Sequence, residues 1–149
     1  AAAPPPPRRC LLLDASRGAP VPYAEAHAWQ RALLEERIAP AAGGACRPPG
    51  ALLVVQHTPT FTLGTGSELR HLLFPPGAPP DGFELHRAER GGEATYHGPG
   101  QLVLYPVLDL GRDHTPDLHW YMRQLEGVAL QAMRDAFGIE GTRVEGLTG

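Results

Sequence analysis

The pattern of apolar and polar positions along the chain predicts several short strands separated by turns. Apolar or alternating runs of strand length occur at residues 10–13, 51–56, 60–63, 83–88 and 102–110. The first run, CLLL, should be a buried strand. Because Pro106 has no backbone N–H to donate, it places the last run at a sheet edge or at a bulge. Residues 139–144 could begin a further strand.

Two segments have the spacing of amphipathic helices. In residues 22–38, Pro22 suits the first turn, and the expected apolar face consists of Ala26, Trp29, Leu33, Leu34 and Ile38. Residues 116–137 form the clearest element of the chain. Its continuous apolar stripe, which should end at Gly138, consists of Leu118, Tyr121, Met122, Leu125, Ala129, Ala132, Met133 and Ala136.

The start of the second helix has several favourable residues. Thr115 can cap it, Pro116 suits its first position, and Asp117 would lie near the positive end of the helix dipole. Strands and helices in this mixed order predict an α/β or α+β fold, in which helices pack on a mixed sheet.

The chain begins with a segment of low complexity. Residues 1–9 (AAAPPPPRR) contain no acidic side chain and resemble either the end of an organelle transit peptide or a disordered N-terminus, between which composition does not decide. We therefore expect residues 1–19 to hold a leader and the first strand, and residues 20–149 to hold the folded domain. The glycine- and proline-rich segments 39–50 and 75–82 should be loops.

Composition limits the chemistry that these residues can perform. The chain has 149 residues and a net charge of −3, and its 13 basic residues are all arginine. A mechanism that needs a lysine base therefore cannot be completed here. No basic stripe interleaved with aromatic residues indicates nucleic-acid binding, and no apolar run approaches the ~20 residues of a membrane span. Cys10 and Cys46 lack metal-site spacing; we expect reduced thiols, although a disulfide between them stays open.

Residues 90–101 (RGGEATYHGPGQ) carry the strongest functional signal. Their four glycines allow positive φ angles and let the backbone approach a ligand without obstruction by Cβ atoms. Exposed N–H groups in such a loop can hold a carbonyl oxygen or an anion. Between the glycines lie a hydroxyl, an aromatic wall and an imidazole, from Thr95, Tyr96 and His97, and Arg90 is a fixed donor at the entrance.

These features predict a ligand-binding loop between two strands. The missing GK[ST] ending excludes a P-loop, and the absence of a following helix excludes a dinucleotide-binding fingerprint. The alternative is a tight, glycine-rich crossover built around a buried histidine.

The segment RGGEATYHGPGQLVLYPVLDL, residues 90–110, resembles the signature of the lipoyl(octanoyl) transferases, which are related in fold to biotin and lipoate protein ligases. QHTPTFTLG at 56–64, HLL at 71–73 and RVEGLTG at 143–149 resemble flanking segments of that family. DLHWYMRQLEGVAL at 117–130 resembles its plant plastid branch. The resemblance runs from about residue 20 onward and implies a ligase-type catalytic domain that is C-terminally incomplete.

The resemblance implies an acyltransferase of lipoate biosynthesis and protein lipoylation, with no cofactor. Members take an octanoyl group from octanoyl-acyl carrier protein onto a cysteine and pass it to a lysine of a lipoyl domain, in 2-oxoacid dehydrogenase E2 subunits or the glycine cleavage H protein. The implied compartment is the plastid stroma, with the mitochondrion as alternative. The family's cysteine and lysine both follow the GLTG segment, and Cys10 and Cys46 do not stand in family positions. We therefore expect a fragment that is inactive alone.

The residues that carry over from the family line its acyl pocket beside the thioester: Arg90, Gly91, Gly92, Glu93, Ala94, Thr95, Tyr96 and His97. Among them, His97 should orient the loop or lie near the thioester. Two alternatives remain. One is a lipoate or biotin ligase, which would need a lysine-bearing nucleotide site and usually has an RRxSGGGAV-like loop. The other is a truncated, non-catalytic module that binds acyl groups or lipoyl domains.

The other histidines give no clear site. His114 and His119 lack a third ligand, so no metal site is predicted. His27, His57, His71 and His86 are scattered along the sequence.

Overall fold

The computed structural model describes residues 9–39 and 48–146. They belong to two compact units, one that ends at Leu108 and one that begins at Asp109. The first unit contains two three-stranded sheets and a helix, and the second is helical. Residues 1–8 of the expected leader, most of the expected loop 39–50 and Cys46 lie outside the described residues.

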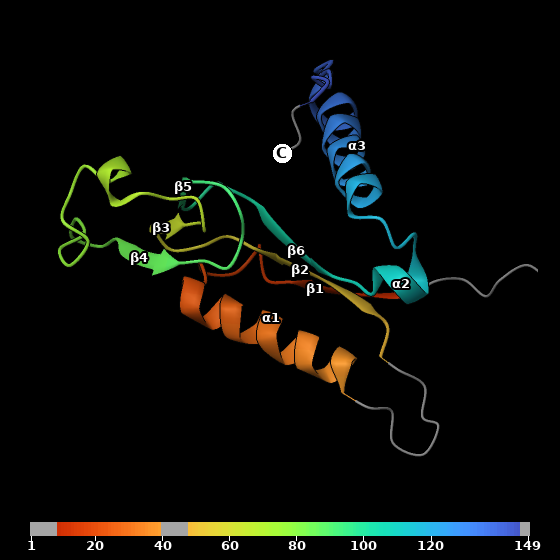
Figure 1. Ribbon diagram of the computed structural model, residues 1–149, viewed down its shortest axis with the longest axis horizontal. Coiled ribbons are helices and arrows are strands. Elements are labelled where there is room, and N and C mark those ends of the chain that lie inside the picture. Colours follow the sequence, from red (N-terminus) through yellow and green to blue (C-terminus); the bar gives the residue numbers. More distant parts are fainter. Residues whose placement is uncertain (1–8, 40–47, 147–149) are drawn as a thin grey trace, which may run out of the picture. The chain divides into compact units, whose positions relative to one another are not determined.

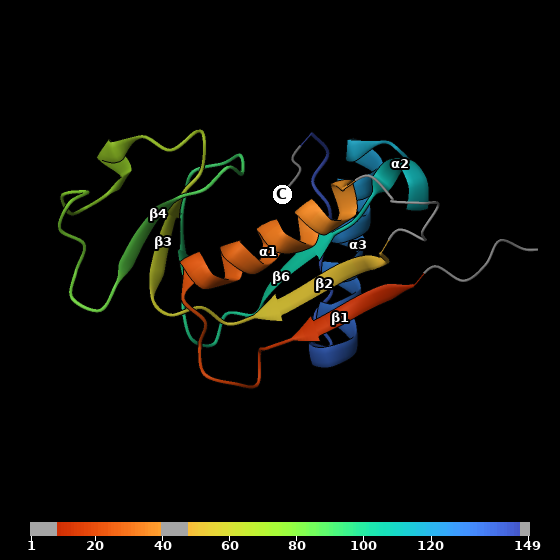
Figure 2. The same ribbon diagram turned by 90° about the horizontal axis from the view of Figure 1, so that it is seen from below.

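The first sheet consists of β1 (Cys10–Asp14), β2 (Gly50–Val55) and β6 (Val103–Val107), in the order β1-β2-β6. β1 runs parallel to β2, and β6 runs antiparallel to it. Helix α1 (Tyr23–Ile38) lies along one face of this sheet (Figures 1 and 2). The core between them comprises Val21, Ala26, Leu53 and Val55, with Leu13, Ala15, Val103 and Tyr105 packed around it.

The position of Pro106 confirms the expectation of an edge strand. It lies in β6, opposite Leu52 of β2, and β6 is the outer strand on that side of the sheet. β1 is the outer strand on the other side, and here the expectation of a buried strand is wrong. Leu11 is 48% exposed and Leu12 is 60% exposed, because an outer strand has one neighbour and Leu13 alone packs against the core.

Helix α1 differs from the predicted helix in its start and in its buried face. Pro22 is the N-cap, with φ −53° and ψ 140°, so the first helical residue is Tyr23. Ala26 is fully buried, but Trp29, Leu34 and Ile38 of the expected apolar face are exposed. The inward row instead includes Arg37, whose Nη1 donates to the Pro48 carbonyl at 2.9 Å.

The second sheet consists of β3 (Thr60–Leu63), β4 (Glu84–Arg87) and β5 (Ala94–His97), in the order β4-β3-β5. β4 is parallel to β3, and β5 is antiparallel to it. A short 3-10 helix, η2 (Leu69–His71), lies in the connection between β3 and β4. The strand predicted at 60–63 has these bounds in the structure, whereas β5 falls inside the segment predicted to be a loop.

The second unit contains α2 (Leu110–Asp113) and α3 (Leu118–Phe137). The α3 cap is Asp117, whose carboxylate accepts from the Trp120 N–H at 3.1 Å, so the assignment of Thr115 is wrong. Asp117 has the extended backbone of an N-cap, with φ −136° and ψ 114°, so the first helical residue is Leu118 and Pro116 precedes the helix. Gly138 ends α3 in the left-handed region, as expected, with φ 66°.

No strand forms at residues 139–144, contrary to the expectation. This segment instead contacts α3: Nη2 of Arg143 donates to the Arg123 carbonyl at 2.9 Å, and its Nε lies 3.1 Å from Glu126. Within the described residues, no helix is long and apolar enough to cross a membrane.

The α3 cap can be tested by substitution. We expect Asp117→Ala to lower the free energy of unfolding by about 1 kcal/mol, because an N-terminal N–H of the helix loses its acceptor. Thr115→Ala is the matched control and should change it by less than about 0.5 kcal/mol. Urea denaturation measures both, and equal losses in the two variants would contradict this assignment of the cap.

Candidate functional site

The β4-β3-β5 sheet has one polar face and one aromatic face. Side chains alternate between the two faces of a strand, and the register places six polar residues on the same side: Thr60, Thr62, Glu84, His86, Thr95 and His97. Thr60 and Thr62 are 0% and 1% exposed. The sheet therefore turns hydroxyls, imidazoles and a carboxylate towards the interior.

The aromatic face is centred on Phe61. Its ring stacks on Phe83, with centroids 5.6 Å apart, and packs against Phe74 and Tyr96. Tyr96 is 46% exposed. The sequence alone groups Tyr96 with Thr95 and His97 in one loop, but because these residues belong to β5, Tyr96 and His97 lie on opposite faces of the sheet.

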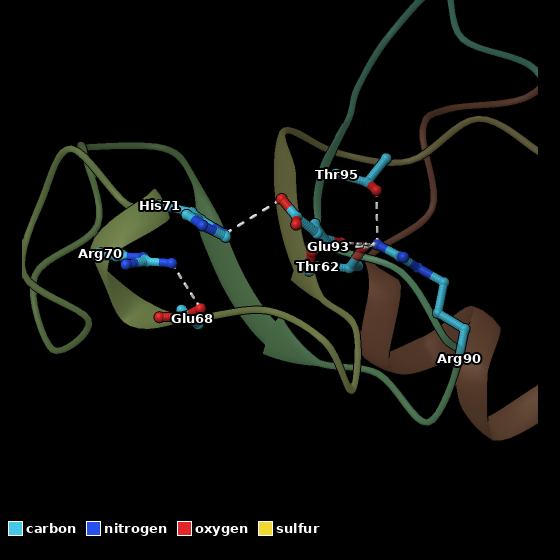
Figure 3. Close-up of polar contacts among 7 residues, drawn as sticks. All are labelled: Thr62, Glu68, Arg70, His71, Arg90, Glu93 and Thr95. Carbon is cyan, nitrogen blue, oxygen red and sulfur yellow. Dashed lines mark hydrogen bonds and ion pairs between the residues drawn. The ribbon is translucent and has the colours of Figure 1, made fainter.

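Arg90 holds the glycine loop in place by hydrogen bonds (Figure 3). Its Nη2 donates to the hydroxyls of Thr62 at 2.8 Å and Thr95 at 2.7 Å, and to the Glu93 carbonyl at 3.0 Å. Nη1 donates to the Gly91 carbonyl at 2.9 Å. The guanidinium expected to be a donor at the loop entrance thus bonds to the loop itself and to β3.

The same loop is also attached to the turn after β3. The N–H groups of Thr65 and Gly66 donate to the carbonyls of Arg90 and Gly92 at 2.9 and 3.2 Å. A Cβ atom on Gly64 would overlap the Gly91 and Gly92 carbonyl oxygens, so this close approach requires glycine. On the opposite side of the loop, the Glu93 carboxylate lies 3.4 Å from Nδ1 of His71 in η2 (Figure 3).

The two glycines at the tip of the loop differ in what they allow. Gly92 has φ +83°, a conformation that L side chains rarely adopt. Gly91 is exposed, and a Cβ atom added there would meet nothing within 4 Å. The tip therefore presents bare backbone with open space beside it, while the polar side chains of the loop form the hydrogen bonds and ion pair that hold the loop in place.

A second group of polar residues surrounds His57, and no sequence motif predicts it. The buried His57 contacts the Val21 carbonyl through Nδ1 at 2.9 Å and the Tyr105 hydroxyl through Nε2 at 2.8 Å. A carbonyl only accepts, so Nδ1 carries the proton and the Tyr105 hydroxyl donates to Nε2. The ring of His97 packs edge-on against that of His57, with centroids 5.9 Å apart.

Tyr23, the first residue of α1, lies among the histidines that are scattered in the sequence. Its ring centroid is 6.0, 5.6 and 5.0 Å from those of His27, His57 and His86. His86 in turn bonds through Nε2 to the Glu84 carboxylate at 2.6 Å. These residues come from far-apart segments, so no spacing in the sequence could have revealed the cluster.

Burial shifts the protonation of this interior towards neutral forms. It lowers the pKa of His57, an effect to which nearby His97 adds and which the bond to the Val21 carbonyl opposes. Burial also raises the pKa of Tyr105 to about 12 and raises that of Tyr23. The cluster is therefore uncharged at neutral pH around His57 and the two tyrosines.

Within the described ranges, no group of three or more His, Cys, Asp or Glu side chains could hold a metal ion. His114 packs instead near Trp120, with ring centroids 6.4 Å apart. Cys10 is a free, exposed thiol at the start of β1.

The fold and the glycine loop agree with a single class of proteins. The chain belongs to the lipoyl protein ligase A/B catalytic domain family, whose sequence pattern matches residues 22–148. It is 52% identical over 129 residues to an octanoyltransferase of Synechococcus sp. (strain WH7803), covering 87% of this chain and 51% of that protein. It is also 42% identical over 144 residues to a chloroplastic octanoyltransferase of Arabidopsis thaliana, covering 96% of this chain and 49% of that protein.

The chain thus spans about half the length of these curated relatives. Among solved structures, it resembles a protein from T. acidophilum described as a lipoate protein ligase with bound lipoic acid, with a TM-score of 0.60, 18% identity, and coverage of 89% of this chain and 49% of that one. The predicted family and its α+β fold are confirmed.

The buried histidine predicts a dependence of stability on pH. Because the folded pKa of His57 lies below its unfolded value of 6.5, the unfolded chain binds more protons between these two values. We expect the free energy of unfolding to fall as the pH drops below about 6.5. Urea denaturation between about pH 5 and 8 measures it.

His57→Gln should remove part of this slope, whereas His119→Gln, an exposed position on α3, should retain it. An unchanged slope in His57→Gln would show that another group is responsible.

Proposed function

We propose that this chain contributes the acyl-binding loop of an octanoyltransferase of lipoate biosynthesis. The complete protein would take octanoyl from octanoyl-acyl carrier protein onto a cysteine, as an acyl-thioester, and pass it to a lysine of a lipoyl domain. Support comes from the family, from relatives named octanoyltransferase at 42–52% identity, and from the geometry of the loop.

The observation that carries the proposal is the open backbone at the tip of the loop. A Cβ atom at Gly91 would have no other atom within 4 Å, and Gly92 keeps a left-handed φ that disfavours any side chain. An alkyl chain can therefore lie directly on this backbone. Burying an octanoyl tail there could contribute up to ~5 kcal/mol, at about 0.8 kcal/mol per methylene.

Within this proposal the eight family residues have three roles: contact with the acyl chain, support of the loop, and an aromatic wall. Gly91, Gly92 and Ala94 would contact the acyl chain, and Arg90 and Thr95 would hold the loop through the bonds described above. His97 would hold it through Nδ1, which lies 2.6 Å from Oε1 of Gln101. Glu93 would fix the outer side of the loop through His71, and Tyr96 would form an aromatic wall on the exposed face of the sheet. The lysine would come from outside these residues, since the chain contains no lysine. The nucleophilic cysteine would do so too, because Cys10 and Cys46 do not stand in family positions.

The acceptors in this proposal are the lipoyl domains of 2-oxoacid dehydrogenase E2 subunits and the glycine cleavage H protein. The plastid stroma is the proposed compartment, supported by the chloroplastic relative in Arabidopsis thaliana. The Synechococcus relative, at 52% identity, comes from a cyanobacterium and does not bear on the compartment.

The test uses the full-length protein with octanoyl-acyl carrier protein and a lipoyl domain. We expect an acyl-enzyme, seen by mass spectrometry as one added octanoyl group, and octanoylation of the lipoyl domain without ATP. Gly92→Val should reduce acyl-enzyme formation by about tenfold or more, since a β-branched residue at positive φ costs about 1–3 kcal/mol.

Gly77→Ala is the matched control, because that glycine has open space around it and no positive φ. Dependence on ATP and free acid would instead indicate a ligase, and binding without transfer would indicate a non-catalytic module. Normal acylation of Gly92→Val would refute the assignment of the loop.

A further inference from the structure

The hydroxyl of Thr62 joins the two halves of the glycine loop from a neighbouring strand. Thr62 lies in β3, outside the loop, and is 1% exposed. Its Oγ1 is 2.8 Å from Nη2 of Arg90 and 3.1 Å from Nε2 of His97. Arg90 begins the loop and His97 ends β5, so this buried oxygen connects the entry of the loop to its exit.

The direction of each hydrogen bond in this cluster can be assigned from its donors and acceptors. A guanidinium only donates, so Oγ1 of Thr62 accepts from Arg90 and its own hydrogen is available for His97. Nε2 of Gln101 donates to the Tyr96 carbonyl at 3.2 Å, which turns its Oε1 towards Nδ1 of His97 at 2.6 Å. Nδ1 of His97 therefore carries the proton, and Nε2 accepts from Thr62.

The result is one chain of hydrogen bonds from Arg90 through Thr62, His97 and Gln101 to the Tyr96 carbonyl. Both ring nitrogens of His97 are used, which leaves neither free to take a proton from a substrate. The chain therefore fits one neutral tautomer of His97.

We propose that Thr62 is a positioning residue for the acyl loop: its hydroxyl links Arg90 to His97 and, together with Oε1 of Gln101, holds this imidazole in the Nδ1–H tautomer. The inference rests on the proposed function for its kinetic consequence, since a loop that binds an acyl-thioester must keep its backbone fixed. Loss of the hydroxyl would release His97, then Gln101, and so loosen the return of the chain at residues 97–101.

The experiment compares Thr62→Val with Thr62→Ser in the full-length protein. Valine keeps the shape of threonine and removes the hydroxyl, whereas serine keeps the hydroxyl. Thr60→Val is the matched control: Thr60 is buried on the same face of β3 and pairs with His97 in the register, but its hydroxyl donates to the Thr58 carbonyl and not to the imidazole. Long-range ¹H–¹⁵N NMR reports the tautomer of His97, and steady-state kinetics report octanoyl transfer.

We expect wild type, Thr62→Ser and Thr60→Val to show the single Nδ1–H tautomer, and Thr62→Val to show a mixture. Transfer by Thr62→Val should fall about tenfold or more in kcat, with a smaller change in KM. If Thr62→Val does not fold, Thr62→Ala, which removes the hydroxyl without adding bulk, takes its place.

A purely structural role would leave the tautomer unchanged in Thr62→Val, and that result would overturn the proposal. An equal loss of octanoyl transfer in Thr60→Val and in Thr62→Val would also overturn it. If the wild-type protein transfers no octanoyl group, the proposed function fails, and the tautomer comparison alone then supports or overturns the role of Thr62.

Discussion

The guanidinium of Arg90 is the group on which the glycine loop depends. It donates hydrogen bonds to the loop at Gly91 and Glu93, to Thr95 of β5, and to Thr62 of β3, so a single planar cation connects three stretches of chain. Hydrogen bonds from charged donors are about twice as strong as neutral ones. The backbone at Gly91 and Gly92 can therefore remain bare of side chains without being free to move.

This arrangement requires a sheet whose interior face is polar. Thr60, Thr62 and His57 are buried at 0–1% exposure, where an unpaired polar group would be costly. Each of them is hydrogen-bonded, and among the described residues Ser67 Oγ is the buried side-chain oxygen that lacks a partner. The aromatic residues that would ordinarily fill such an interior, Phe61 and Tyr96, lie on the opposite face.

The sequence predicts where helices and strands occur better than it predicts which side of each one faces the interior. The strand at 60–63 and the end of α3 at Gly138 follow from local patterns, because β propensity and a left-handed glycine are local properties. β5 escapes prediction because its four residues lie between glycines and lack an apolar run. The inward side of β3 could not be predicted, since Thr-Phe-Thr alternation fits either orientation of the strand.

The glycine loop alone predicts the position of the candidate site. The residues that hold this loop and pack around it come from distant parts of the sequence. Thr62 lies 28 positions before Arg90, and His57 reaches Val21 and Tyr105 over separations of 36 and 48 residues. Such contacts are set by the pairing of strands and leave no periodic signal. The loop sequence therefore indicates the family, whereas the hydrogen bonds that hold the loop can be identified only in the folded chain.

Hydrogen exchange at the backbone amides of Thr65 and Gly66 tests this account most directly. Both donate to carbonyls of the loop that Arg90 holds. In Arg90→Lys the charge is kept but the planar set of donors is lost, and we predict faster exchange at both amides, while the Ala15 amide, which donates to Val54 in the other sheet, keeps its rate. Unchanged protection at Thr65 and Gly66 would contradict the central role of Arg90.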